Sequence, residues 1–203
     1  MGNETTLMTE KVEGRTLVLG ISGSPRRGGN SETLLDEALL GAHEAGAQTE
    51  KVILSALKFS PCISCGACLK SGVCVQKDEM QGLYAKILAT DVLIFASPIY
   101  FYSVSAWTKS AIDRCQALWA RKYVLKDQYF KTQKKGYFIA VGASKGNQLF
   151  EGAKLVMKYF FDATGYTLAG KLLVDGVDGK EEILKYPEYL KDAHRLGAEA
   201  IGL

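Results

Sequence analysis

The stretch TLVLGISGSPRRGGNS, from Thr16 to Ser31, decides the fold of this chain. Its first six residues, Thr16 to Ile21, are apolar or β-branched and carry no charge, which is typical of a strand buried on both faces of a parallel sheet. The glycine- and serine-rich residues that follow indicate a loop, and from Ser31 onward apolar residues recur at helical spacing. A strand, a glycine-rich loop and a helix in this order open an α/β unit.

The rest of the chain continues this alternation of strands and helices. Asn30 or Ser31 is placed to cap the first helix. Another helix is expected to begin at Asp78, with Gln81 as its capping-box partner. Four further strands are expected at residues 49–54, 92–96, 137–142 and 167–174, and three further helices at residues 105–120, 148–163 and 188–200.

Strands that alternate with helices form a parallel sheet with helices on both faces, a three-layer α/β sandwich. Five strands favour the flavodoxin-like order 2-1-3-4-5, numbered along the chain. Such sheets bind ligands beyond the carboxyl ends of their strands, where the strand order reverses. We expect one domain of this kind over residues 15–203, preceded by a polar, flexible arm over residues 1–14.

The composition is that of an ordinary globular protein. Apolar residues make up 47% and charged residues 23% of the 203 residues, close to the average. The net charge of +3 is too small to argue for nucleic acid or an anionic membrane as a partner. No apolar run reaches the roughly 18 residues of a membrane span. No signal-peptide pattern is present either, so a cytoplasmic location is expected.

Four of the five cysteines lie close together in the pattern C-x2-C-x2-C-x5-C. The run resembles the C-x2-C-x2-C-x3-C-P of bacterial ferredoxins, with a longer last gap and no final proline. An iron–sulfur cluster is the favoured interpretation, ahead of redox-active thiols and of zinc, whose cysteine pairs usually stand further apart. The four candidate ligands are Cys62, Cys65, Cys68 and Cys74.

These cysteines lie in an insertion over residues 60–77, between the second strand and the helix expected at Asp78. Long loops inside compact domains are usually functional. No second cysteine run is present, so Cys74 is best taken as the fourth ligand of the same cluster. Cys115 lies within an expected helix and is interpreted as a packing residue. The two histidines are expected on the surface, and their scarcity argues against His-based acid–base catalysis.

The loop after the first strand has the features of a phosphate site. Its glycines let backbone N–H groups approach an anion, and the following helix adds its positive N-terminal dipole. Arg26 can add charge, and neither the P-loop nor the G-x-G-x-x-G pattern is present. The alternative interpretation is an ordinary Gly-Ser turn. Further hydrogen-bond donors are Ser22, Ser24, Asn30 and Ser31.

Two more loops are expected at carboxyl ends of strands. Residues 97–103 carry three aromatic side chains that can pack against a flat ring, although they could equally pack on the core or against another subunit. Residues 142–147 are mostly small and leave room for a ligand, although a plain turn would look the same. The three loops together argue more strongly for a ligand site than any one of them, because all three are expected at the carboxyl ends of strands in the same sheet.

Taken together, these residues resemble the NADPH-dependent FMN reductase–like branch of the flavodoxin superfamily. More narrowly, they are similar to the iron–sulfur flavoproteins of anaerobic microbes. The resemblance spans residues 16–170 and includes the cysteine run. It is carried further by Gly23-Ser24-Pro25-Arg26, Gly29-Asn30-Ser31, Asp78-Glu79-Met80, Ser97-Pro98-Ile99-Tyr100 and Ile112-Asp113-Arg114.

The resemblance implies bound FMN and a [4Fe–4S] cluster on the four cysteines. It also implies a homodimer or homotetramer in which subunit contact brings cluster and flavin together. Tyr102 stands where many similar proteins carry a smaller residue. The positions matching the phosphate loop are Ser22, Ser24, Pro25, Arg26, Asn30 and Ser31; those beside the flavin ring are Pro98, Ile99, Tyr100, Phe101, Tyr102 and Ser103; those at its other edge are Gly142, Ala143 and Ser144.

The function expected is intracellular electron transfer or reduction that couples the one-electron chemistry of a cluster to the two-electron chemistry of FMN. A ferredoxin or another small electron carrier and a small-molecule acceptor are the expected partners, and NAD(P)H is a candidate reductant. One alternative is an NAD(P)H-dependent FMN or quinone reductase without a cluster. Another is a non-catalytic redox sensor. No residue stands out as an acid–base catalyst.

Overall fold

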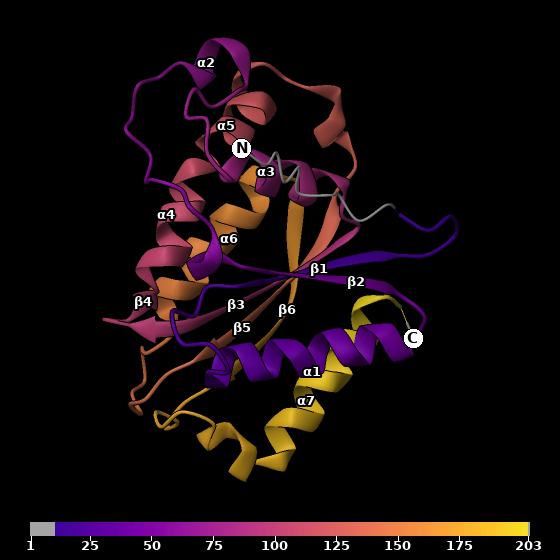
Figure 1. Ribbon diagram of the computed structural model, residues 1–203, viewed down its shortest axis with the longest axis vertical. Helices are drawn as coiled ribbons and strands as arrows, with labels where there is room; N and C mark the ends of the chain where they lie inside the picture. The colour runs from indigo at the N-terminus through magenta and orange to yellow at the C-terminus, as the bar shows by residue number, and fades with distance from the viewer. Residues whose placement is uncertain (1–10, 203) are drawn as a thin grey trace, which may run out of the picture.

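The computed structural model describes residues 11–202, which form a twisted parallel sheet between two layers of helices (Figure 1). The strands follow the order β2-β1-β3-β5-β6, and each neighbouring pair is parallel. Numbered along the chain, these strands have the predicted order 2-1-3-4-5, which confirms the fold class. They are β1 (Leu17–Ser22), β2 (Gln48–Ile53), β3 (Val92–Tyr100), β5 (Lys134–Val141) and β6 (Tyr166–Val174).

A short sixth strand, β4 (Ser103–Val104), pairs antiparallel with the end of β3. The sequence predicted a loop over residues 97–103, and this was wrong. β3 instead continues to Tyr100, with Pro98 in the ladder opposite Val141. Proline is usually confined to sheet edges, bulges or the first residue of a strand. Pro98 therefore argued against a strand at this position, and the predicted strand ended too early.

The two faces of the sheet bury separate apolar cores. On one face α1 (Asn30–Glu44) and α7 (Pro187–Ala200) pack over Val18, Ile94 and Ile139. On the other face the remaining long helices pack over Leu19, Phe95 and Phe138. The odd and even positions of each strand therefore face different layers. The helices of this second layer are α3 (Met80–Ala89), α4 (Ala106–Arg114), α5 (Gln116–Trp119) and α6 (Glu151–Thr164).

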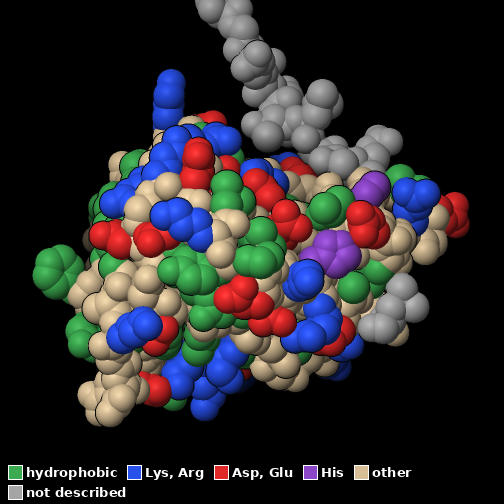
Figure 2. All heavy atoms as spheres, turned by 90° about the horizontal axis from the view of Figure 1, so that it is seen from below, with side chains coloured by type: hydrophobic (Ala, Val, Ile, Leu, Met, Phe, Trp, Pro, Cys, Tyr) green, Lys and Arg blue, Asp and Glu red, His purple; other side chains and the backbone are tan. Residues whose placement is uncertain are grey.

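α1 and α7 cross closely because glycine occupies the contact on both sides. A Cβ at Gly41 would lie 2.0 Å from the His194 carbonyl oxygen, and one at Gly197 would lie 1.8 Å from that of Ala38. Figure 2 views the molecule from this side, where acidic and basic side chains are intermixed. The predicted surface placement of the histidines is confirmed: His43 is exposed and His194 is partly exposed, with its Nε2 2.9 Å from Glu44 Oε2.

The helix predicted over residues 105–120 is interrupted. α4 ends at Arg114, Cys115 joins it to α5, and one π-helical turn, η2 (Ala120–Val124), follows. Cys115 is buried, which confirms its predicted packing role. No helix in the described range is long and apolar enough to cross a membrane. The remaining short helices are η1 (Leu54–Ala56), α2 (Cys68–Ser71), η3 (Gln128–Lys131) and η4 (Glu182–Lys185).

The arm predicted over residues 1–14 lies mostly outside the described residues. Of the described part, Lys11 contacts the residue just before β3 through an ion pair of 2.6 Å between its Nζ and Asp91 Oδ2. The Val12 N–H donates to Gln48 Oε1 at 2.8 Å.

Candidate functional site

The loop from β1 to α1 is held against the middle of β3 and the N-terminus of α4. The Gly23 N–H donates to the Ala96 carbonyl at 2.8 Å, and Ser105 Oγ donates to the Gly23 carbonyl at 2.6 Å. A Cβ at Gly23 would lie 1.8 Å from Thr108 Oγ1, so only glycine fits there. Ser105 also caps α4, because its Oγ accepts from the Thr108 N–H. The loop therefore begins at a fixed point of the sheet.

Beyond this point lies a cavity of about 180 Å³ at the carboxyl ends of β1, β3 and β5. The cavity brings together parts of all three segments that the sequence singled out. It does not include Ser22, Pro25, Phe101, Tyr102, Ser103, Gly142 or Ser144 in its lining. Its walls are formed by Ser24, Arg26, Gly29, Asn30, Ser31, Pro98, Ile99, Tyr100, Val141, Ala143, Val177 and Asp178.

Val177 and Asp178 are site residues that sequence reasoning missed. They lie in the loop after β6, separated from its end by two residues, at the same carboxyl edge of the sheet as the other loops. The rule that located those loops could have found this one, had it been applied to the fifth strand as well.

The cavity suits an anion such as a phosphate group. The N-terminus of α1 opens on it through Gly29, Asn30 and Ser31, and no side chain caps the helix there. The predicted caps Asn30 and Ser31 are therefore wrong. Uncapped N–H groups and the helix dipole both favour an anion. Behind the loop, the Ser22 hydroxyl is buried and has no hydrogen-bond partner among the described residues.

Two predicted phosphate donors contact the segment after β6. Arg26 Nη1 donates to the Asp178 carbonyl at 3.0 Å. Asn30 Nδ2 donates to the Gly179 carbonyl at 2.9 Å, while its Oδ1 accepts from the Ile183 N–H at 3.2 Å. Both side chains retain further N–H groups. They therefore fix the wall formed by Val177 and Asp178 and still have donors to offer a ligand.

The turn between β3 and β4 lies at this edge of the sheet (Figure 1) and consists of two aromatic residues, Phe101 and Tyr102. Phe101 and Tyr102 have φ angles of 49° and 60°, the left-handed conformation that a two-residue hairpin turn requires. Glycine and asparagine usually fill such positions, so this turn is strained. Phe101 is fully exposed, and Tyr100 lines the phosphate-type cavity. The hairpin thus supplies flat aromatic surface beside the anion site.

All four cysteines of the run line a second, larger cavity of about 780 Å³. α4, α5 and α6 form the opposite wall, which is rich in apolar and aromatic side chains such as Trp119 and Phe160. The loop predicted over residues 60–77 contains a helical turn, α2, that begins at Cys68. Cys62 and Cys65 are exposed, whereas Cys68 and Cys74 are partly buried. The four cysteines of the sequence pattern therefore lie around the same cavity.

One backbone N–H group within this loop points toward a thiol. The Ser64 N–H donates to Cys62 Sγ at 3.4 Å, and Ser64 and Gly66 have positive φ angles of 54° and 72°. Burial raises the pKa of the Cys68 thiol, and the charges of the other three cysteines raise it further. Four thiolates would thus repel one another unless a cation lay between them. Within residues 11–202, no three His, Cys, Asp or Glu side chains are arranged to hold a single metal ion.

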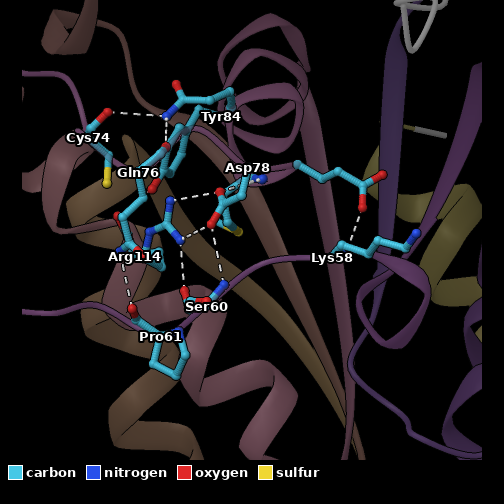
Figure 3. A network of polar contacts seen from close by, with 11 residues as sticks. Lys58, Ser60, Pro61, Cys74, Gln76, Asp78, Tyr84 and Arg114 are labelled. Atoms are coloured by element: carbon cyan, nitrogen blue, oxygen red, sulfur yellow. Dashed lines mark hydrogen bonds and ion pairs between the residues drawn. The ribbon is translucent and has the colours of Figure 1, made fainter. Parts of the chain in front are cut away.

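The two ends of the cysteine loop meet at one buried ion pair, shown in Figure 3. Arg114 Nη1 and Nη2 bind the Asp78 carboxylate at 2.6 and 2.9 Å, and Nη1 also donates to the Ser60 carbonyl at 2.7 Å. Ser60 precedes the first cysteine and Asp78 follows the last. We call this meeting point, residues 58–61 with 74–81, the neck of the loop.

Further hydrogen bonds close the neck. Gln81 Nε2 donates to the carbonyls of Cys74 and Gln76, and Gln76 Nε2 donates to the Pro61 carbonyl (Figure 3). The Glu79 carboxylate accepts from the Lys58 N–H. The predicted capping box is therefore wrong: Gln81 holds the cysteine loop, while Asp78 Oδ1 accepts from the Met80 N–H at 3.2 Å.

The ion pair at the neck sets the charge state of both partners. Burial opposes ionisation of Asp78, but the hydrogen bonds and charge of Arg114, together with the N–H groups of Ser60 and Met80, outweigh it and lower the Asp78 pKa. Burial likewise opposes the charge on Arg114, yet Asp78, Tyr84 and Cys74 raise the Arg114 pKa above its ordinary value. Asp78 and Arg114 are therefore both charged near neutral pH.

The two cavities have no lining residue in common. In Figure 1 the cysteine loop around α2 lies above the sheet, whereas the hairpin at β4 and the start of α1 lie lower down. Within one chain, the cysteines and the phosphate-type cavity are thus separate.

A parallel sheet of this strand order, with a cavity at the carboxyl ends of its strands, is that of a flavodoxin-like α/β protein. A flavodoxin from the domain Archaea superposes with a TM-score of 0.55 at 12% identity, covering 91% of this chain and 96% of that one. The family model for NADPH-dependent FMN reductase matches residues 16–167. The chain belongs to this family, in the branch whose members are named iron–sulfur flavoproteins.

Three relatives illustrate this placement. One iron–sulfur flavoprotein of Archaeoglobus fulgidus is 44% identical over 47% of this chain, but the match spans only 44% of that protein. A second one from the same organism is 37% identical over 79% of this chain and 76% of its own length. A Bacillus subtilis protein named as an NAD(P)H-dependent FMN-containing oxidoreductase is 30% identical over 87% of this chain and 93% of its own.

Proposed function

We propose that this protein is a flavin-dependent oxidoreductase that binds FMN and carries one [4Fe–4S] cluster. The observation that carries the proposal is the convergence of four cysteines on one cavity in a chain whose sheet offers a separate phosphate-type site. When bound, FMN supplies two-electron chemistry and the cluster one-electron chemistry.

The residues of the smaller cavity fit the phosphate end of FMN. The uncapped start of α1 offers backbone N–H groups, and Ser24 and Ser31 offer hydroxyls beside them. Arg26 lies in the same wall and offsets the phosphate charge. Tyr100 from the hairpin forms the wall toward which the flavin ring would extend. Val177 and Asp178, which the sequence did not point to, complete this wall.

The residues of the larger cavity fit an iron–sulfur cluster. A cluster is larger than a single ion and is held by thiolates spread around it, as these four cysteines are spread over one cavity wall. Iron neutralises the thiolates, which would otherwise repel one another. The Ser64 N–H already points at Cys62 Sγ, and such contacts stabilise thiolate charge.

The separation of the two cavities bears on assembly. Electrons must pass between cluster and flavin, and one chain places them apart, so we propose a homodimer or homotetramer in which one chain's cysteine loop faces another chain's flavin. A ferredoxin or another small electron carrier is the proposed donor, and a small molecule is the proposed acceptor. NAD(P)H is a further candidate reductant.

Anaerobic reconstitution with iron and sulfide tests the cluster directly. Iron and acid-labile sulfide should reach about four atoms each per chain, alongside flavin absorbance. Cys65→Ser should lose the cluster and keep the flavin, because Cys65 lies in the exposed loop and away from the smaller cavity.

Cys115→Ser is the matched control. Burial raises the pKa of Cys115 to about 12, so its thiol stays protonated and is a poor ligand. This variant should reconstitute like the parent protein. Flavin without iron in the parent protein, under the same supply, would overturn the cluster part of the proposal.

A reductase without a cluster is the second candidate. The Bacillus subtilis relative favours it, because that protein matches nearly the whole chain and is named as an NAD(P)H-dependent oxidoreductase. This alternative predicts rapid flavin reduction by NAD(P)H and full turnover in Cys65→Ser. The cluster proposal predicts that Cys65→Ser loses one-electron transfer.

A further inference from the structure

Arg114 has one hydrogen-bond donor that its neck contacts leave unexplained. Its side chain is fully buried, and Nη1 and Nη2 bind Asp78 and Ser60. Nε is buried as well and has no hydrogen-bond partner among the described residues. An unpaired buried donor is destabilising, more so on a charged group, and is rare in native proteins. The contacts at the neck therefore provide acceptors for Nη1 and Nη2 of Arg114 but none for its Nε–H.

The missing acceptor is best sought in the cysteine cavity. Arg114 forms part of the cavity wall together with all four cysteines. Figure 3 shows the Cys74 sulfur on the side of the loop that faces Arg114. The Cys74 backbone is fixed there, because its carbonyl accepts from Gln81 Nε2 at 3.2 Å. Negative charge on Cys74 is also among the influences that favour the charged form of Arg114.

We propose that Arg114 donates its Nε–H to a sulfur of the bound cluster, either the Cys74 thiolate or an inorganic sulfide. This inference rests on the proposed function. Hydrogen bonds to cluster sulfurs and nearby charge set the reduction potential. The reduced cluster carries one more negative charge, so Arg114 stabilises the reduced form and raises the potential.

A pair of variants with opposite effects on local charge tests the proposal. Arg114→Gln removes the cation and the Nε–H, so the ratio of reduced to oxidised cluster at the parent's midpoint should fall about tenfold, a one-electron shift of about 59 mV. Asp78→Asn leaves the Arg114 charge without its carboxylate partner, so the same ratio should rise. Redox titration of reconstituted protein, followed by electron paramagnetic resonance, measures both.

The opposite signs separate this role from a purely structural one. Both variants open the neck, so a role confined to the neck predicts shifts of the same sign or equal loss of the cluster. Either result would overturn the proposal. Loss of the cluster in Arg114→Gln alone would support it. If Asp78→Asn does not fold, Arg114→Lys replaces it; the retained charge should then give a smaller fall than Arg114→Gln, and an equal fall would count against the proposal.

Failure of this inference is distinguishable from failure of the proposed function. If the parent protein takes up no iron or sulfide, the cluster itself is absent. If the parent protein loads normally and both variants keep its midpoint, the cluster is present and Arg114 does not act on it.

Discussion

Gly23 is the residue at which the phosphate loop has least freedom. Its N–H and carbonyl are both bonded to other elements, and its missing side chain leaves room for Thr108. Gly82, in the first turn of α3, is the opposite case, because a Cβ there would meet nothing within 4 Å. Two glycines of the same chain thus serve different purposes, and substitution distinguishes them.

Gly23→Ala should lower the free energy of unfolding by about 1–3 kcal/mol, because the added methyl group overpacks against Thr108. The displaced loop should also bind FMN more weakly. Gly82→Ala is the control and should stabilise the protein by about 0.5–1 kcal/mol through helix propensity. Urea denaturation and flavin titration measure both effects. Equal stability of the two variants would contradict the tight packing at Gly23.

At the scale of elements, the neck fixes the two ends of the cysteine loop to the rest of the domain. Its bonds join residues far apart in sequence, such as Arg114 and Asp78. Asp78 has a lowered pKa when folded, so it stabilises the protein above the ordinary carboxyl pKa of 3.8. That stabilisation is lost as the pH falls through the lower folded value.

The neck should therefore open in acid in a way that depends on Asp78. Below about pH 4, the melting temperature of the apo-protein should fall more steeply in the parent protein than in Asp78→Asn, which has no such proton to take up. Calorimetry across a pH series measures the two slopes. Parallel slopes would show that the Asp78–Arg114 pair contributes nothing to the acid dependence.

Local patterns predicted the elements of the sheet but not the contacts between them. The strands and their order followed from apolar periodicity and from the alternation with helices, because these signals are local. The β3–β4 hairpin was missed because Phe101 and Tyr102 occupy a turn that glycine or asparagine normally fills. The role of Gln81 was misjudged because its partners, Cys74 and Gln76, lie in a loop without periodicity. Asp178 was missed because the rule that ligands bind at the carboxyl ends of strands was not applied to the fifth strand.

At the scale of the whole molecule, exposed apolar side chains are concentrated around the cysteine loop. Ile63, Leu69, Val73 and Val75 on the loop are exposed, as are Leu155 and Tyr159 on α6. Exposed apolar surface of this kind is typical of protein contacts. It lies on the part of the molecule that the proposed oligomer would bring against another chain's flavin.

Leu155→Glu should shift the protein toward smaller species in sedimentation, because a carboxylate buried at a subunit contact is unfavourable. Leu155 is 57% exposed, so the variant should still fold. Leu40→Glu is the control: Leu40 is 45% exposed and lies on α1, across the sheet. A monomeric parent protein, or equal dissociation of both variants, would contradict an interface at α6.

The neck also bears on how such proteins diversify. The cysteine segment leaves the sheet after η1, returns at α3, and is tied off by side chains at its base. Its replacement by a short connector would leave every strand pairing intact. We therefore regard the segment as a removable module. Exchange of this segment would let related proteins gain or lose the cysteine site without changing the sheet. The segment could also be grafted onto a related flavodoxin-like scaffold, together with Arg114, Asp78 and Gln81.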